Sequence, residues 1–366
     1  MPRPRRASAR AKEIVYLWGA GATQAEISYL GARNVNLLMR DNDQLGDGVA
    51  TRILKRLPKR WRSKFSPDHP TDIEKLISLL AASNVEEYAI LAERIRQLYF
   101  EDIRTNLAEA AVLLNPELAI GLLTMHLNDQ FRQREILSGI ITTNHDGLLQ
   151  LATQRVGTPV NIGIPFRSEE LTTDTSGATP VLQLHGSFTW IFGLPLQVSV
   201  LSETSSYSAN TVWIPPTILK ESKSYPFNKL SALAYELLTK HCDVLRVVGS
   251  ALTQNDWNII SLIFNAQRHR ELTKEPPFRV ELIMPHDAGT AVTKECSYLT
   301  ELTPIGFLTD GAFEAYKGEL GDDALTSEMK NPLFYWLKQK IQYHFDRGDF
   351  GALPLDPTLR KITGDS

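Results

Sequence analysis

The sequence predicts an α/β protein: a Rossmann-like, doubly wound parallel sheet that carries an all-helical insertion. Short apolar segments alternate with helical patterns along the chain, which is typical of parallel sheets built from βαβ units. The apolar segments end in glycine or polar residues, and the corresponding edge of such a sheet is where ligands bind. Five segments have this strand pattern: 13–18, 136–143, 180–184, 243–248 and 279–284.

A long helical stretch interrupts this alternation. Residues 72–135 show no strand pattern, so we expect an all-helical insertion there. Thr71 and Glu74 have the spacing of a capping box and open a helix with one apolar face, formed by Ile73, Leu76, Ile77 and Leu80. Further helical patterns cover 86–98, 103–113 and 117–127.

The patterns divide the chain into four parts. Residues 1–12 form a basic tail that we expect to be disordered. Residues 13–40 and 136–320 form the Rossmann-like domain, 41–135 the helical insertion, and 321–366 a C-terminal helix and tail, with the helix over 331–345. Within the main domain, 211–214 reads as a short strand and the polar segment 193–210 as a loop.

The composition limits the function classes. Hydrophobic residues make up 43% of the 366 residues and charged residues 22%, as in folded globular proteins. The net charge of −3 argues against a protein that mainly coats nucleic acid. Cys242 and Cys296 are too few for a four-cysteine zinc site, so we expect no metal. No apolar run reaches the ~18 residues of a membrane helix and no signal-peptide pattern follows the basic N-terminus, so we expect a cytoplasmic protein.

Residues 51–64 contain seven basic residues around Trp61. Such a run suits a surface for phosphate or for an acidic partner, but charge runs are more often solvated. We therefore expect a solvated loop between elements.

Four short motifs follow the predicted strands. Gly19-Ala20-Gly21 lies between the first strand and the first helix, where small residues let backbone N–H groups approach an anion. The full dinucleotide-binding glycine pattern is absent, because Gln24 stands at its sixth position. The other three motifs are Asn144-His145-Asp146, His185-Gly186 and Gly249-Ser250. Each alone is ordinary turn chemistry, but together at one sheet edge they predict a ligand site.

In this order the motifs resemble those of the sirtuin superfamily. The chain reads GAGAT at 19–23, TTNHD at 142–146, LHGS at 184–187 and VVGSALTQND at 247–256. Protein-deacylating sirtuins also carry a G-I-P-D-F-R segment and four zinc cysteines, which are missing here. The chain is therefore more similar to the bacterial sirtuin-like effector domains of anti-phage defence systems, which cleave NAD.

The resemblance implies which residues bind NAD. Backbone N–H groups of Gly19, Ala20 and Gly21 would hold the pyrophosphate, with Thr23 beside them. On the late strand, Gly249 and Ser250 would bind phosphate or the adenosine ribose. Asp287 would bind the adenine ribose.

The resemblance also implies three catalytic residues. Asn144 would orient the ribose hydroxyls or the attacking water. Asp146 would accept a hydrogen bond from the nicotinamide carboxamide. His185 would act as the general base, since the side chain of histidine ordinarily titrates near neutral pH. We prefer His185 to His145 as the catalytic histidine, because His145 occupies the variable position between Asn144 and Asp146, and we expect Asp256 to cap a helix.

The expected activity is that of an NAD+ hydrolase that releases nicotinamide and ADP-ribose, with a cyclic product left open. The resemblance implies NAD depletion during infection, restrained by homo-oligomerisation or by a partner such as a HerA-type ATPase or another defence-system sensor. Two alternatives stay open: an NAD-dependent protein deacylase, and a non-catalytic module that senses NAD or ADP-ribose. We expect no membrane association and no direct nucleic-acid binding.

Overall fold

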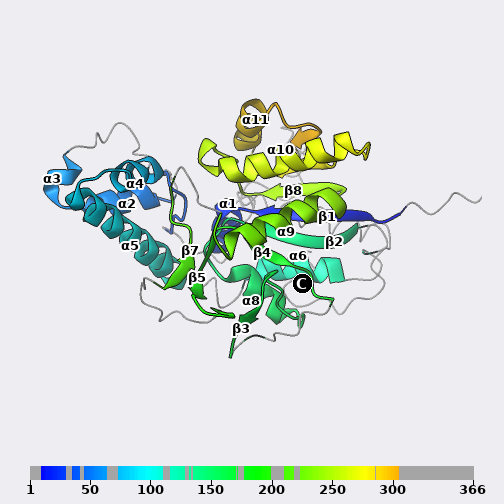
Figure 1. Ribbon diagram of the computed structural model, residues 1–366, viewed down its shortest axis with the longest axis horizontal. Helices are drawn as coiled ribbons and strands as arrows, with labels where there is room; N and C mark the ends of the chain where they lie inside the picture. The colour runs from blue at the N-terminus through cyan, green and yellow to red at the C-terminus, as the bar shows by residue number, and fades with distance from the viewer. Residues whose placement is uncertain are drawn as a thin grey trace, which may run out of the picture.

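The computed structural model places one parallel sheet between layers of helices, with a helical lobe beyond one end of the sheet (Figure 1). The described residues are 10–29, 35–41, 45–63, 73–109, 116–127, 132, 135–169, 171, 177–198, 210–217, 223–284 and 286–304. The predicted C-terminal helix over 331–345 and most of the predicted N-terminal tail lie outside them.

The main sheet has six strands, and every neighbouring pair is parallel. Its strands are β1 (Lys12–Trp18), β2 (Glu135–Thr142), β4 (Val181–Gln183), β8 (Val244–Val248), β9 (Arg279–Ile283) and β10 (Leu302–Pro304). They lie in the order β10-β9-β8-β1-β2-β4, so the chain builds outward from β1 in one direction and then returns to build outward from β8. This is the strand order of the Rossmann fold, and it confirms the predicted fold class. The direction reverses between β1 and β8.

Helices cover both faces of the sheet. One face carries α1 (Ala20–Tyr29), α6 (Glu117–Leu127) and α8 (Leu148–Arg155); the other carries α9 (Phe227–Lys240), α10 (Trp257–Leu272) and α11 (His286–Glu295). Side chains of β1 alternate between the two cores, as the two-residue period of a strand requires. Ile14, Tyr16 and Trp18 pack on the α1 side, and Val15 and Leu17 on the α10 side.

The helical lobe has a hydrophobic core of its own. The lobe consists of α2 (Val49–Arg56), α3 (Lys59–Arg62), α4 (Ile73–Ala81) and α5 (Glu86–Glu109). The four apolar residues predicted for one face of α4 are all buried. Thr71, the predicted capping residue, lies outside the described residues. The patterns over 86–98 and 103–113 belong to one continuous helix, α5.

Helix α6 falls within the segment 41–135 that the sequence assigns to the helical insertion, but it packs on the main sheet with α1 and α8. Glu26 of α1 caps it, because the carboxylate accepts hydrogen bonds from the backbone N–H groups of Leu118 (3.0 Å) and Ala119 (2.6 Å). A carboxylate at a helix N-terminus is favourable for the helix dipole.

The basic segment does not form the loop that we predicted. It forms α2 and α3, and Trp61 is buried in the lobe core. Acidic residues of α5 pair with it: Arg52 lies 2.6 Å from Asp102, Arg56 lies 2.5 Å from Glu101, and Arg60 lies 2.8 Å from Glu87. Three of the seven basic side chains of the segment are therefore paired with acidic residues of α5.

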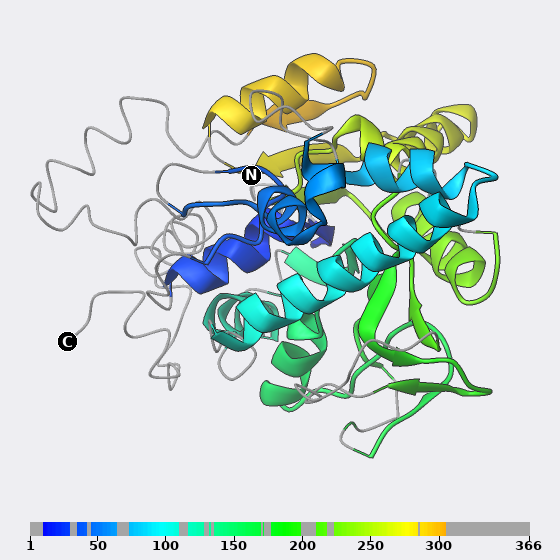
Figure 2. The same cartoon turned by 90° about the vertical axis from the view of Figure 1, so that its left-hand side faces the viewer.

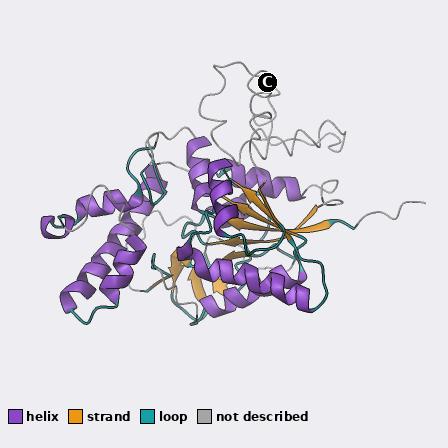
Figure 3. Ribbon diagram, turned by 90° about the horizontal axis from the view of Figure 1, so that it is seen from above, coloured by secondary structure: helices purple, strands orange, loops and turns teal. Residues whose placement is uncertain are grey.

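A second, four-stranded sheet was not foreseen from the sequence. Its strands are β3 (Phe166–Arg167), β5 (Gly186–Ile191), β6 (Leu196–Val198) and β7 (Thr211–Trp213), in the order β3-β6-β5-β7. Of these only β7 was predicted, and β6 lies within the predicted loop. Figure 3 shows the strands of both sheets in orange, with the helical lobe to one side. The second sheet matters because β5 begins directly after His185.

None of the helices among the described residues combines the length and the apolar character needed to cross a membrane.

Candidate functional site

Strand register brings the predicted motifs to one edge of the main sheet. Trp18, the last residue of β1, lies opposite Thr142 of β2 and Val248 of β8. Thr142 in turn lies opposite Gln183, the last residue of β4. The four motifs follow these strand ends directly. They therefore lie at the carboxyl edge, around the point where the strand order reverses.

Two glycine turns touch each other at this point. The backbone N–H of Gly19 donates to the carbonyl of Val248 (2.9 Å), and that of Gly21 donates to Gly249 (2.8 Å). A Cβ added at Gly21 would lie 2.7 Å from the Gly249 oxygen. A Cβ added at Gly249, whose φ is +60°, would lie 2.2 Å from the Ala22 nitrogen. Only glycine fits such an approach of two backbones.

This contact corrects the predicted pyrophosphate cradle. Two of the three amides assigned to it, those of Gly19 and Gly21, already donate to the end of β8. The third belongs to Ala20, the exposed first residue of α1. The glycines serve close packing, and the anion-binding potential rests on the N-terminus of α1.

Asn144, Thr23 and Asp146 form a hydrogen-bonded network between β2 and α1. Asn144 Nδ2 donates to Thr23 Oγ1 (2.9 Å) and to the Gly19 carbonyl (3.1 Å). Thr23 Oγ1 then donates to Asp146 Oδ2 (3.1 Å). Both amide protons of Asn144 are used by the protein, so Oδ1 is the atom that it can offer to a ligand.

Burial raises the pKa of the Asp146 carboxyl above its ordinary value. Hydrogen bonds from the backbone N–H groups of Leu148 (3.0 Å) and of Asp146 itself, and from the side chains of Thr23 and Asn144, oppose the effect without cancelling it.

The turn that carries Asn144 and Asp146 is held by the segment from β4 to β5. Gln183 Nε2 donates to the carbonyls of Asn144 (3.1 Å) and Asp146 (2.6 Å). Ser187 Oγ donates to the carbonyl of His145 (2.9 Å). Sequence reasoning missed both residues as site residues. The available signal was a glutamine inside the apolar segment 180–184.

His185 is buried at the same edge, with 3% of its surface exposed. Its backbone carbonyl accepts from Ile214 (2.8 Å), and its Nε2 lies 3.2 Å from Nδ2 of Asn258. Gly186 has a φ of +70°, and a Cβ there would lie 2.2 Å from the Val212 oxygen, so this corner also requires glycine. Asn258, on the first turn of α10, was not among the predicted residues.

His145 lies in an aromatic cluster beside His185. Its ring stacks on Phe188 (5.0 Å between centroids), meets Trp213 edge-on (5.2 Å) and lies 6.2 Å from the His185 ring. Tyr99 of α5 stacks on Trp213 at 6.0 Å, with the ring planes 4° apart. Figure 2 shows α5, in cyan, beside the green strands of the second sheet. The helical lobe therefore contacts the site, which the sequence did not indicate.

Ser250 and Asp287, the other predicted NAD-binding residues, follow β8 and β9. Ser250 is buried next to Gly19. Asp287 lies in the first turn of α11, after β9, and its side chain is not among the described ones.

Asp256 stands at the N-cap of α10 but makes no capping hydrogen bond; it accepts instead from Thr253 Oγ1 at 3.3 Å. The predicted capping role of Asp256 is therefore wrong.

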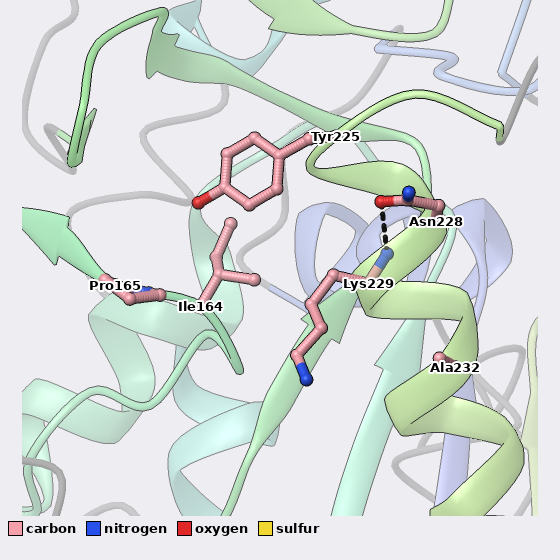
Figure 4. A pocket seen from close by; sticks show the side chains of 6 residues that line it. All are labelled: Ile164, Pro165, Tyr225, Asn228, Lys229 and Ala232. Atoms are coloured by element: carbon pink, nitrogen blue, oxygen red, sulfur yellow. Dashed lines mark hydrogen bonds between the residues drawn. The ribbon is translucent and has the colours of Figure 1, made fainter.

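A surface pocket of about 470 Å³ lies elsewhere, at the N-terminus of α9 (Figure 4). It is lined by Ile164, Pro165, Tyr225, Asn228, Lys229 and Ala232. None of the predicted site residues lines it, and its walls are mostly apolar. It offers none of the acid–base groups that gather at the carboxyl edge of the main sheet.

Fold and site together define an α/β protein with a Rossmann-like sheet and a polar site where its strand order reverses. No protein-family model matches the chain, and no curated protein matches it either. Within the described part of the chain, no group of three or more His, Cys, Asp or Glu side chains could hold a metal ion.

Proposed function

We propose that this protein is an NAD+ hydrolase, which cleaves the bond between nicotinamide and ribose to give nicotinamide and ADP-ribose. One observation carries the proposal. The hydrogen-bonded network of Asn144, Thr23 and Asp146 adjoins the glycine turns, and the buried imidazole of His185 lies at the same edge of the sheet. An anion-binding helix end and acid–base groups thus share one edge of the sheet.

The binding half of this proposal uses the two central turns. The pyrophosphate would lie at the N-terminus of α1, near the Ala20 amide, where the helix dipole favours negative charge. Gly249 and Ser250 would contact the same phosphates or the adenosine ribose from the β8 side. Asp287, in the first turn of α11, would bind the adenine ribose.

The chemical half uses the polar turns after β2 and β4. Asn144 Oδ1 would orient a ribose hydroxyl or the attacking water, and Asp146 would accept from the nicotinamide carboxamide. His185 would take the proton of the water as its oxygen bonds to the anomeric carbon. The electron pair of the broken bond passes to the pyridinium nitrogen, so nicotinamide leaves as a neutral molecule.

The resemblance of the four motifs to sirtuin-like defence effectors supports a cellular role. We propose that the protein depletes NAD in the cytoplasm during phage infection. A homo-oligomer or a partner, such as a HerA-type ATPase, would restrain the activity until then.

Nicotinamide release from NAD, followed by chromatography with the purified full chain, tests the activity. His185→Ala should slow release at least about a hundredfold, in line with the 10²- to 10⁴-fold effect of a general base, and Asn144→Ala should slow it about a hundredfold because the reacting groups lose their orientation. Two variants at exposed positions of α10 serve as matched controls: Asn265→Ala and His269→Ala. Folded site variants that cleave as fast as the wild type would contradict the assignment. NAD binding without turnover would favour a sensing module, and NAD-coupled removal of an acyl group from a lysine peptide would favour a deacylase.

A further inference from the structure

The side chain beside His185 determines which ring nitrogen is available for chemistry. Neutral imidazole has one nitrogen that carries a proton and one with a lone pair, and only the second can act as a base. Nε2 of His185 lies 3.2 Å from Nδ2 of Asn258. With the amide in this orientation its NH₂ group donates to Nε2, which places the lone pair on Nε2 and the proton on Nδ1.

Asn258 is held in place by the helix that carries it. It lies in the first turn of α10, directly after the short 3-10 helix η1 (Gln254–Asp256). The next two residues, Ile259 and Ile260, are 2% and 3% exposed and pack into the core between α10 and the main sheet. A side chain on such a rigid element positions its neighbour better than one on a loop.

The oxygen of the same amide is a second observation. Asn258 Oδ1 is buried, and no described residue donates a hydrogen bond to it. Buried polar atoms are nearly always paired in folded proteins, so an orphan acceptor next to a candidate base is a place for a donor from a ligand. A ribose offers two neighbouring hydroxyl groups, each of which can donate.

We propose that Asn258 is a positioning residue for His185. In the free protein its amide donates to Nε2 and holds the imidazole as the neutral tautomer with the proton on Nδ1. In the complex the same amide orients the hydroxyl or water that Nε2 deprotonates. This inference rests on the proposed function, because it assigns His185 the role of general base.

The tautomer can be measured without any turnover. In the full chain labelled with ¹⁵N-histidine, the His185 ring is identified by comparison with His185→Ala. The wild type should show a protonated Nδ1 and an unprotonated Nε2. The near-isosteric Asn258→Asp replaces the donor with an acceptor, so the proton should move to Nε2. Asn265→Ala, two turns further along α10 and exposed, should leave the ring signals unchanged.

Kinetics provide the second readout. Asn258→Ala should lower kcat for nicotinamide release about tenfold to a hundredfold, a fraction of the full effect of a general base. KM should change less than about threefold, because the phosphate and adenosine contacts are retained. A merely structural loss would instead lower the amount of folded protein, without moving the proton on the ring.

The outcomes separate this inference from the proposed function. A wild type that cleaves NAD while Asn258→Asp leaves the ring spectrum unchanged and Asn258→Ala keeps the full kcat would overturn the inference alone. A wild-type ring with its proton on Nε2 would also overturn it. If the folded wild type binds NAD and releases no nicotinamide, the proposed function fails, whatever the ring spectrum shows.

Discussion

Two regions of the same sheet edge, the contact between two glycine turns and the turn after β2, are built by opposite means. The contact between the turns after β1 and β8 is backbone against backbone, with Gly21 and Gly249 leaving no room for a Cβ. The turn after β2 is instead held by side chains, since Gln183 and Ser187 donate to its carbonyls. The first construction depends on the absence of side chains, and the second depends on particular donors. They should therefore respond differently to mutation.

The largest expected effect is in the glycine contact. Gly249→Ala would place a Cβ 2.2 Å from a backbone nitrogen at a φ of +60°, so both a clash and backbone strain arise. We expect a loss of about 3 kcal/mol in the free energy of unfolding, as for overpacked sites. Chemical denaturation measures it.

A matched glycine separates the two causes. Gly157 has a φ of +76° but nothing within 4 Å of an added Cβ, so Gly157→Ala tests strain alone. It should cost only about 1 kcal/mol. Equal losses in both variants would show that the backbone contact adds nothing.

The side-chain-built turn should lose somewhat less. Gln183→Leu fits an apolar strand but leaves the carbonyls of Asn144 and Asp146 without their donor and Gln150 Nε2 without its acceptor, which should cost about 2 kcal/mol. Nicotinamide release should fall as well, because Asn144 and Asp146 lose their support. The control is Gln197→Leu, at an exposed position of β6, which should change stability by less than about 0.5 kcal/mol. Gln183→Leu with unchanged stability and activity would refute the role of Gln183.

Asp146 should make the folded protein less stable as the pH rises, whereas a carboxylate in a buried ion pair makes it more stable. Because burial raises its pKa in the folded protein, its contribution to stability is fully present below the unfolded pKa, near pH 4. It is lost as the pH rises through the raised pKa, by at most about 1.4 kcal/mol per pH unit. Asp146→Asn should remove this pH dependence from unfolding curves.

Asp41 gives the reverse control. A hydrogen bond from the Gly48 backbone N–H lowers the pKa of its carboxyl, so its contribution is present above the unfolded pKa and lost as the pH falls through the folded one. Asp41→Asn should therefore remove stability mainly at higher pH. The same pH trend in both variants would contradict the assignments.

The smallest effect is expected in the helical lobe, away from the glycine contact and from the turn after β2. Arg60 pairs with Glu87, but both side chains are more than half exposed. Arg60→Ala should change the free energy of unfolding by less than about 0.5 kcal/mol, as is usual for surface pairs. Nicotinamide release should stay at the wild-type rate. A clear loss of activity would instead support the basic segment as a phosphate-binding surface.

The sequence predicted the parallel sheet well, because its central strands are buried on both faces and form continuous apolar segments. It failed for β10 and for three of the four strands of the second sheet, which are too short or too irregular to show a period. The glycine motifs were visible, but their role was partly wrong. The amides of Gly19 and Gly21 bind the end of β8, which only the register of two distant strands reveals.

The candidate site was predictable only as far as each residue follows a strand. Asn144, Asp146 and His185 were found because polar residues after apolar segments stand out. Gln183 and Asn258 were missed because their function lies in contacts with residues that are far away in the sequence. Tyr99 was missed for the same reason, because it belongs to the helical lobe and stacks on Trp213 beside the site.

A crystal structure of the His185→Ala chain with NAD tests the central claim most directly, because this variant should bind the dinucleotide without cleaving it. The pyrophosphate should lie at the N-terminus of α1, beside the contact of the two glycine turns. The nicotinamide ribose should lie next to Asn144 and Asp146. A dinucleotide bound elsewhere, such as in the pocket at the N-terminus of α9, would contradict the account.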